Sequence, residues 1–327
     1  MLNSVRIRPF NRFRRVVLGT MMAAALGLSA SAAQAIGPAA AVKPLQVVAT
    51  FSILGDMVKE IGGEHVSVVT IVGPNADAHT FEPTPADIKA LAAAEVLVLN
   101  GLDFEGWLPR LTEAAGFKGA RVLASEGVAV RHLRAGEAQQ NHGHREGDVD
   151  PHAWQSLENG MVYAQNIAEG LSKAAPMHRA YYKNRTKLYT EQMKKLDTEI
   201  KLALADIPDD KRKVISSHDA FGYFAQAYNI RFFSVAGLSN QAEPSAKEMA
   251  ALIDTVKKME VAGVFIEHSA SPKLVSQIAR ETGARVGGAL YSDALAPSDQ
   301  PASTYLGMFT WNAGQLIYVL KDSVVKP

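Results

Sequence analysis

The sequence predicts an α/β protein with two lobes, each built on a four-stranded parallel sheet, and one long helix between them. Three observations predict this class. Short β-rich runs alternate with helix-length segments, this rhythm occurs twice, and residues 176–205 between the two sets contain no glycine and no internal proline. The 327 residues suffice for about two domains, and an apolar content of 47% can fill their cores.

Eight runs rich in β-branched residues are predicted to be strands. They are 47–51, 66–72, 96–100, 121–124, 214–217, 231–235, 264–267 and 286–290. Helix start signals lie between them. Thr84 supplies an N-cap, Pro85 suits the first helical position and Asp87 the third, while Ser245 and Glu248 have the spacing of a capping box. Strands separated by helices are typical of parallel βα units.

Residues 176–205 are predicted to form one helix, because apolar side chains recur there at spacings of three and four. At 1.5 Å per residue this helix would be about 45 Å long, and Pro208 would end it. We expect a rigid bridge between the lobes that permits only small rotation; a helix packed against one lobe is the alternative. The predicted organisation is a signal peptide at 1–35, an N-terminal metal-binding lobe at 36–175, the bridging helix at 176–205 and a C-terminal metal-binding lobe at 206–327.

The first 35 residues have the pattern of an export signal. Five arginines are followed by an uncharged run at 16–28 and by small residues that end in Ala33, Gln34 and Ala35. The run is shorter than the ~20 residues that cross a bilayer, which favours a cleaved signal peptide over a membrane anchor. The general and the twin-arginine export routes both stay open. Because the chain contains no cysteine, we expect a periplasmic protein with no lipid anchor.

Charge and cysteine content exclude several classes of function. Removal of the five arginines in residues 1–35 leaves 29 basic residues against 33 acidic ones, so a nucleic-acid partner is not expected. The absence of cysteine excludes disulfides, thiolate metal sites and cysteine nucleophiles.

Four side chains with metal-binding chemistry follow predicted strands. His79 lies in the loop after 66–72, His152 in the long connection after 121–124, His218 at the end of 214–217 and Asp293 just past 286–290. Ligands of parallel α/β sheets bind beyond the carboxyl ends of the strands. Three imidazoles and a carboxylate suit a borderline-soft divalent cation, with two groups from each lobe facing across the cleft between them. Taken singly, each of these residues could also be an ordinary loop histidine or capping acid.

Other polar residues are weaker candidates. Glu267 also ends a strand; it could replace a member of the set, or it could accept a hydrogen bond from a ligand imidazole. His142 and His144 lie in a polar stretch at 134–148, where they could hold a metal transiently or belong to a merely soluble loop.

Four segments of the sequence together resemble one known family. They are 77–87 (Asp-Ala-His-Thr-Phe-Glu-Pro-Thr-Pro-Ala-Asp), 150–154 (Asp-Pro-His-Ala-Trp), 217–224 (Ser-His-Asp-Ala-Phe-Gly-Tyr-Phe) and 291–295 (Tyr-Ser-Asp-Ala-Leu). In this order they resemble the zinc- and manganese-specific solute-binding proteins of ABC transporters, the ZnuA-like and TroA-like group. The resemblance extends over essentially the whole chain after residue 35.

The resemblance implies two (β/α)₄ lobes joined by a rigid helix, with the metal between them. The family's ligands correspond to His79, His152, His218 and Asp293, and its partners are a membrane permease with an ATPase subunit. This sequence departs from the family pattern at Ala78, where proline is common. Long histidine-rich insertions of zinc-specific relatives are reduced to His142 and His144, through which a periplasmic metallochaperone could still interact. Manganese-specific relatives usually have glutamate at the position of His218.

The expected function is therefore capture of a divalent metal, zinc before manganese, for an ABC importer, by a monomer that is not an enzyme. A closed site of three histidines and one aspartate is tetrahedral and suits Zn²⁺, whereas Mn²⁺ favours more oxygen ligands. A manganese-binding homologue is the alternative. A zinc hydrolase is disfavoured because the sequence contains no H-E-x-x-H motif and a fourth protein ligand leaves no open position. Binding of an organic solute and a structural or adhesive role are the remaining classes.

Overall fold

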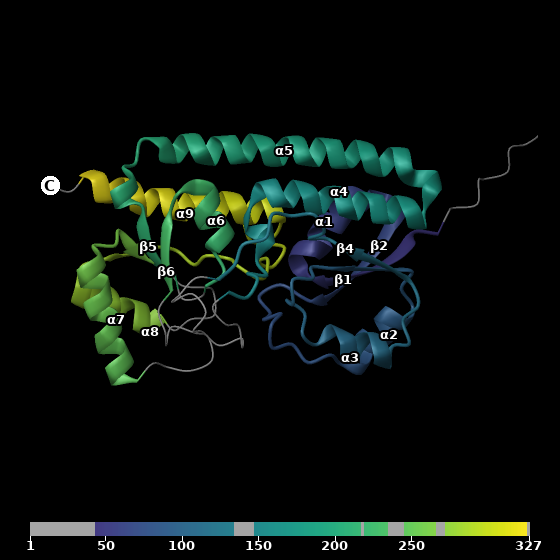
Figure 1. Cartoon of the computed structure of the whole chain (residues 1–327), viewed down its shortest axis with the longest axis horizontal. Coiled ribbons are helices and arrows are strands. Elements are labelled where there is room, and N and C mark those ends of the chain that lie inside the picture. Colours follow the sequence, from purple (N-terminus) through teal and green to yellow (C-terminus); the bar gives the residue numbers. More distant parts are fainter. Residues whose placement is uncertain (1–42, 134–146, 217–218, 235–244, 266–271, 326–327) are drawn as a thin grey trace, which may run out of the picture. The chain divides into compact units, whose positions relative to one another are not determined.

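Two parallel sheets organise the computed structural model, which describes residues 43–133, 147–216, 219–234, 245–265 and 272–325 (Figure 1). The first sheet contains β1 (Leu45–Phe51), β2 (Val66–Val72), β3 (Val96–Leu99) and β4 (Ala120–Leu123) in the order β2-β1-β3-β4. The second contains β5 (Lys213–Ser216), β6 (Arg231–Ser234), β7 (Gly263–Val264) and β8 (Arg285–Val286) in the order β6-β5-β7-β8. All of these strand pairs are parallel, and the strand order is equivalent in the two sheets, so both have the same topology.

Burial along the strands follows their position in the sheet. β1 lies between β2 and β3, and all of its residues except Gln46 are buried. The first half of β2, at the edge of the sheet, alternates between exposed and half-buried residues. A central parallel strand is covered by helices on both faces and therefore consists mainly of apolar residues, whereas an edge strand can keep one face polar.

Helices follow the strands as the sequence predicts. On the first sheet they are α1 (Ser52–Gly62), α2 (Pro85–Ala92), α3 (Leu108–Ala114) and α4 (Leu157–Ala174). The second sheet is followed by α6 (Gly222–Tyr228), α7 (Ala246–Met259), α8 (Pro272–Thr282) and α9 (Tyr305–Val325). The predicted capping box at α2 is present: the Asp87 N–H donates to Thr84 Oγ1, and the Thr84 N–H donates to the Asp87 carboxylate at 2.8 Å. No helix in these described ranges combines the length and hydropathy that a membrane span requires.

The predicted bridging helix is confirmed, with a different first turn. A 3₁₀ turn at Pro176–His178 precedes the α-helix α5 (Arg179–Ala205). α5 packs against α1 and α4 beside the first sheet and against α6 and α9 beside the second (Figure 1). Its buried residues recur every three or four positions, as an amphipathic helix requires. One helix therefore contacts both halves of the fold.

The last two strands are shorter than predicted. β8 ends at Val286, although the sequence predicts a strand to residue 290. A side chain at Gly287 would collide with the Phe265 ring, and one at Gly288 would collide with Gln315. The Gly288 N–H donates to Gln315 Oε1 at 3.1 Å, so the chain leaves the sheet to pack against α9. The predicted end of the preceding strand, 264–267, reaches residues outside the described part of the chain.

The two faces of the second sheet border different cores. Val214 belongs to a large core that runs from β1 through Trp154 to α9, whereas its neighbour Ile215 belongs to a separate cluster in which seven of the described residues are buried. The seven are Ile215, Met249, Ile253, Val256, Val261, Val264 and Ile278, and most of them lie on the sheet, α7 and α8. Adjacent strand residues point to opposite faces, so α7 and α8 cover the face away from the large core.

All of the described residues belong to one compact unit, Lys43–Pro327. The signal peptide predicted at 1–35 and the boundaries predicted at 36–175, 176–205 and 206–327 stay predictions.

A half-buried carboxylate joins the first helix to the last described one. Asp56 on α1 accepts a hydrogen bond at 2.8 Å from the backbone N–H of Tyr305, the first residue of α9. Burial raises the pKa of Asp56 from 3.8 to about 6, although the Tyr305 hydrogen bond lowers it. Between these two values the folded state binds more protons than the unfolded state, so stability falls as pH rises through this window and levels off above pH 6.

We predict that Asp56→Asn stabilises the metal-free protein at pH 7.5, because asparagine keeps an acceptor for the Tyr305 N–H without placing a charge in this half-buried position. The expected gain is about 1–3 kcal/mol in the free energy of unfolding, since each unit by which folding raises a pKa corresponds to about 1.4 kcal/mol. Denaturant unfolding at pH 7.5, 6 and 4 in the presence of a chelator measures it. The gain should shrink towards pH 4, where wild-type Asp56 is protonated in the folded state. Glu113→Gln, at an exposed position on α3, is the control, and a gain independent of pH would contradict the assignment.

Candidate metal centre

His79 is carried by the loop between β2 and α2, and this loop is fixed at several points. The His79 N–H donates to Asp77 Oδ1 at 2.8 Å, and the Thr80 hydroxyl donates to Asp77 Oδ2 at 2.7 Å. The indole N–H of Trp107 donates to the carbonyl of Ala78 at 2.8 Å. Asp77 thus closes a tight local turn, and the hydrogen bond from Trp107 fixes the backbone of that turn at Ala78. Both restrict the position of the His79 imidazole.

His152 is carried by a buried segment just before α4. Its side chain is 4% exposed. The Asn100 amide, directly after β3, donates to the carbonyl of Pro151 at 3.0 Å, and its own oxygen accepts from the hydroxyl of Tyr163 on α4 at 2.6 Å. A 3₁₀ turn at Ala153–Gln155 then leads into α4. Neighbouring elements on the carboxyl side of the first sheet therefore hold the backbone on one side of the imidazole.

Asp293 follows the second sheet, yet residues beside the first sheet hold its loop. The carbonyl oxygen of Ser292 accepts from the indole N–H of Trp154 at 2.8 Å and from the amide of Gln155 at 2.7 Å. Beyond Asp293, the Leu295 N–H donates to the hydroxyl of Ser52 at 2.9 Å. The loop is thus attached on both sides of the carboxylate to the half of the protein that carries the histidines.

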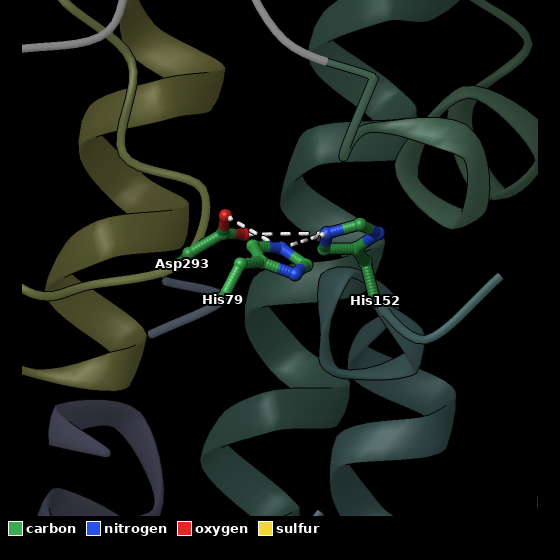
Figure 2. A group of neighbouring side chains, drawn as sticks. All are labelled: His79, His152 and Asp293. Carbon is green, nitrogen blue, oxygen red and sulfur yellow. Dashed lines mark hydrogen bonds and ion pairs between the residues drawn. The ribbon is translucent and has the colours of Figure 1, made fainter. Parts of the chain in front are cut away.

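His79, His152 and Asp293 point toward one another (Figure 2). The two Nε2 atoms are 3.2 Å apart, His79 Nε2 lies 3.4 Å from Asp293 Oδ2, and His152 Nε2 lies 3.6 Å from Asp293 Oδ1. One ligand atom from each residue lies within 4.8 Å of the others. The side chains of His79 and Asp293 are 5% and 11% exposed. Two imidazoles and a carboxylate therefore converge in a nearly dry environment.

Asp150 sets the orientation of the His152 ring. Its Oδ1 lies 2.8 Å from His152 Nδ1 and accepts the His152 backbone N–H at 3.0 Å. Its Oδ2 lies 2.5 Å from Arg131 Nη1. Burial alone would raise the pKa of Asp150, but the hydrogen bonds and charge of His152, with the charge of Arg131, outweigh burial and lower it. An ionised Asp150 favours the tautomer with a proton on Nδ1, which leaves a lone pair on Nε2 toward His79 and Asp293.

The structure brings together three of the four predicted ligands, His79, His152 and Asp293. The fourth, His218, lies outside the described residues. Glu267 and the histidines at 142 and 144 also lie outside them. His79 follows the second strand of its sheet, whereas His218 follows the first strand of the other. In the sequence these two candidates therefore follow non-equivalent strands, whereas His152 and Asp293 both follow the fourth strand of their sheets.

Sequence reasoning missed the residues that support these ligands. Asp150 belongs to the 150–154 segment, and its position two residues before a candidate ligand was the available signal, since aspartate commonly bonds to the backbone two residues ahead. Arg131 and Tyr223 gave no local signal, because their contacts with Asp150 depend on the tertiary fold.

The sequence matches a family model described as "Zinc-uptake complex component A periplasmic", ZnuA, over residues 47–318. One relative is the metal ABC transporter substrate-binding lipoprotein ScbA of Streptococcus cristatus, 30% identical over 89% of this chain and 94% of the relative. Another is the manganese ABC transporter substrate-binding lipoprotein ScaA of Streptococcus gordonii, 30% identical over 90% of this chain and 95% of the relative.

Solved structures of the same kind share the fold. The periplasmic zinc-binding protein TroA of Treponema pallidum matches with a TM-score of 0.74 and 28% identity, over 85% of this chain and 99% of the other. The manganese-bound periplasmic metal-binding protein of Candidatus Liberibacter asiaticus matches with a TM-score of 0.73 and 25% identity, over 85% of this chain and 100% of the other. The predicted fold class is confirmed.

The relatives correct the expected localisation. Several relatives are named lipoproteins, and this finding contradicts the expectation of a periplasmic protein with no lipid anchor, which is wrong. That expectation took the absence of cysteine as the absence of an anchor. Cysteine acylation is only one physical means of holding a protein at a membrane.

The matched family consists of solute-binding proteins, so the expectation that the chain is not an enzyme is confirmed and the hydrolase alternative is wrong. Its members act with the permease and ATPase of an ABC transporter. The family match, the full-length relatives and the shared fold agree with the convergent histidines and aspartate. The chain belongs to the ZnuA family of metal ABC transporter substrate-binding proteins.

Proposed function

We propose that this protein captures one divalent metal ion, with Zn²⁺ preferred over Mn²⁺, and delivers it to an ABC importer. The ligands in this proposal are His79, His152, His218 and Asp293. The observation that carries it is the convergence of two imidazole Nε2 atoms and a carboxylate at separations of 3.2 to 3.6 Å.

These separations match what a small divalent cation requires of its ligands. Zinc binds histidine nitrogen and carboxylate oxygen at about 2.0–2.2 Å, so two ligands of a tetrahedral site lie about 3.3–3.6 Å apart. The two Nε2 atoms lie 3.2 Å apart, and each lies close to a different oxygen of Asp293, His79 at 3.4 Å from Oδ2 and His152 at 3.6 Å from Oδ1. These separations are close to that spacing. The ion is the transported substrate, and binding it requires no chemical step. The residues need only replace its hydration shell and hold neutral imidazoles toward it.

The preference for zinc rests on the chemistry of the donor set. Three nitrogen ligands and one carboxylate favour a borderline-soft ion in a closed tetrahedral site, whereas Mn²⁺ prefers more oxygen ligands. Manganese is the second candidate, because relatives such as ScaA are named for it. Similarity to TroA, a zinc-binding protein by its title, favours zinc. Interaction of a metallochaperone with the segment that bears His142 and His144, and the monomeric state, stay predictions.

We predict that the purified protein binds one equivalent of Zn²⁺ more tightly than Mn²⁺. His152→Ala should weaken zinc binding by more than the roughly 10–100-fold that loss of a ligand's supporting partner costs, because it removes a ligand outright. Competition with a chromogenic chelator measures both affinities. His178→Ala, on the 3₁₀ turn before α5, is the matched histidine control and should bind as wild type does. Unchanged affinity in His152→Ala would refute the assignment.

We further predict that His218→Glu narrows the preference for Zn²⁺ over Mn²⁺, because it replaces a nitrogen ligand by an oxygen ligand and adds negative charge. Zinc binding should persist, since zinc also accepts carboxylates. His218→Ala controls for loss of a ligand and should weaken both metals without a gain for manganese. The measurement is the ratio of the Zn²⁺ and Mn²⁺ affinities in each variant. Circular dichroism verifies that each variant is folded. A ratio that stays the same or widens would mean that residue 218 does not set selectivity.

A further inference from the structure

Asp150 is the most fully buried carboxylate beside the candidate centre. Its side chain has no exposed surface, and both of its oxygens are engaged: Oδ1 by His152 and Oδ2 by Arg131. A carboxylate in such a place is stabilised only if its partners stay in position, because an unpaired buried charge is costly. The geometry of the His152 ring is therefore tied to the position of the Arg131 guanidinium.

The Arg131 guanidinium lies in a space that a glycine leaves open. A β-carbon added at Gly222, the first residue of α6, would lie 2.0 Å from Arg131 Nη1 and 2.2 Å from Cζ. The φ angle of Gly222 is not in the left-handed region, so the backbone does not require glycine there. What requires it is the close approach of the arginine. Helix α6 thus forms one wall of the site in which Arg131 meets Asp150.

Tyr223, the next residue, bonds to both partners through their backbones. Its hydroxyl accepts the Arg131 N–H at 2.9 Å and donates to the carbonyl of Asp150 at 3.0 Å. The Asp150 N–H also donates to the Arg131 carbonyl at 2.8 Å. Helix α6 follows β5 of the second sheet. Its Tyr223 hydroxyl therefore joins the two backbone segments, at Arg131 and at Asp150, that support His152 beside the first sheet.

We infer that Arg131, Asp150, Gly222 and Tyr223 form a positioning cluster that sets the tautomer and orientation of His152, so that metal affinity depends on the packing of α6. This inference rests on the proposed function, since it assigns the support of one proposed ligand. The cluster acts through His152 and does not itself contact the ion. It links a ligand from one half of the protein to a helix from the other.

The test measures zinc affinity and the tautomer of His152 in three variants. Asp150→Asn should weaken zinc binding about 10–100-fold, the usual cost of losing such a partner. If the asparagine oxygen faces Arg131, its NH₂ faces His152 Nδ1 and favours the Nε2–H tautomer, which cannot bind metal. Long-range ¹H–¹⁵N correlation spectra of the metal-free protein report the tautomer directly. Tyr223→Phe and Gly222→Ala should weaken binding about 3- to 30-fold, because both disturb Arg131 and leave the carboxylate in place.

A second buried cluster in the same protein supplies matched controls. The hydroxyl of Tyr228, also on α6, donates to Asp197 Oδ1 at 3.1 Å, and Lys201 lies 2.8 Å from Asp197 Oδ2. Asp197 is 8% exposed and lies on α5. Asp197→Asn and Tyr228→Phe therefore remove a buried carboxylate and a buried tyrosine hydroxyl of the same kind. They should lower stability without changing zinc affinity or the His152 tautomer.

The outcomes separate this inference from the proposed function. Wild-type affinity and an unchanged tautomer in all three cluster variants, while His152→Ala loses zinc, would overturn the inference alone. Equal losses in the Asp197 and Tyr228 controls would overturn it too, because the effect would then be general destabilisation. Failure of the wild-type protein to bind zinc or manganese would instead overturn the proposed function. If Asp150→Asn does not fold, Tyr223→Phe and Gly222→Ala decide the question.

Discussion

The carbonyl oxygen of Ser292 accepts hydrogen bonds from Trp154 and Gln155, and the arrangement of the two halves around the candidate centre depends on this contact. The donors lie two and three residues after His152, and the acceptor directly precedes Asp293. This contact therefore fixes the backbone next to His152 against the backbone next to Asp293, two proposed ligands that are 141 positions apart in the sequence. Each bond contributes about 1 kcal/mol, but losing both would leave several buried polar groups unpaired at greater cost.

Further contacts make this connection stiff. The hydroxyl of Tyr305, at the start of α9, donates to the carbonyl of Trp154 at 2.6 Å, and the ring of Trp154 packs against Phe51 and Phe104. Phe104 also lies edge-on to His79, with ring centroids 4.7 Å apart. The aromatic cluster of Phe51, Phe104 and Trp154 therefore contacts His79 through Phe104 and the loop of Asp293 through Trp154. The packing around the candidate ligands therefore leaves their side chains little freedom to move.

Much of this could be predicted from the sequence, and the limits have physical causes. Strand periodicity and the capping signal at Thr84 are local, so they predicted the elements well, and α5 followed from the absence of helix breakers. The position of His79, His152 and Asp293 at strand ends followed from a rule of parallel sheets. The support by Arg131 and Tyr223 could not be predicted, because it arises from contacts between segments far apart in sequence. The close packing of the Phe265 ring against Gly287, just beyond the end of β8, could not be predicted for the same reason.

The separate core beneath α7 and α8 divides the second half of the protein into regions of unequal cooperativity. Its described residues share the sheet with the large core but lie on the opposite face. Tyr291 and Asn312, which hold the start of the Asp293 loop, lie on the side of α9. Elements that pack in separate cores can open locally at lower free energy than the global transition. A local opening of α7 and α8 would therefore expose this second core without breaking the contacts that attach the Asp293 loop to α9 and Trp154.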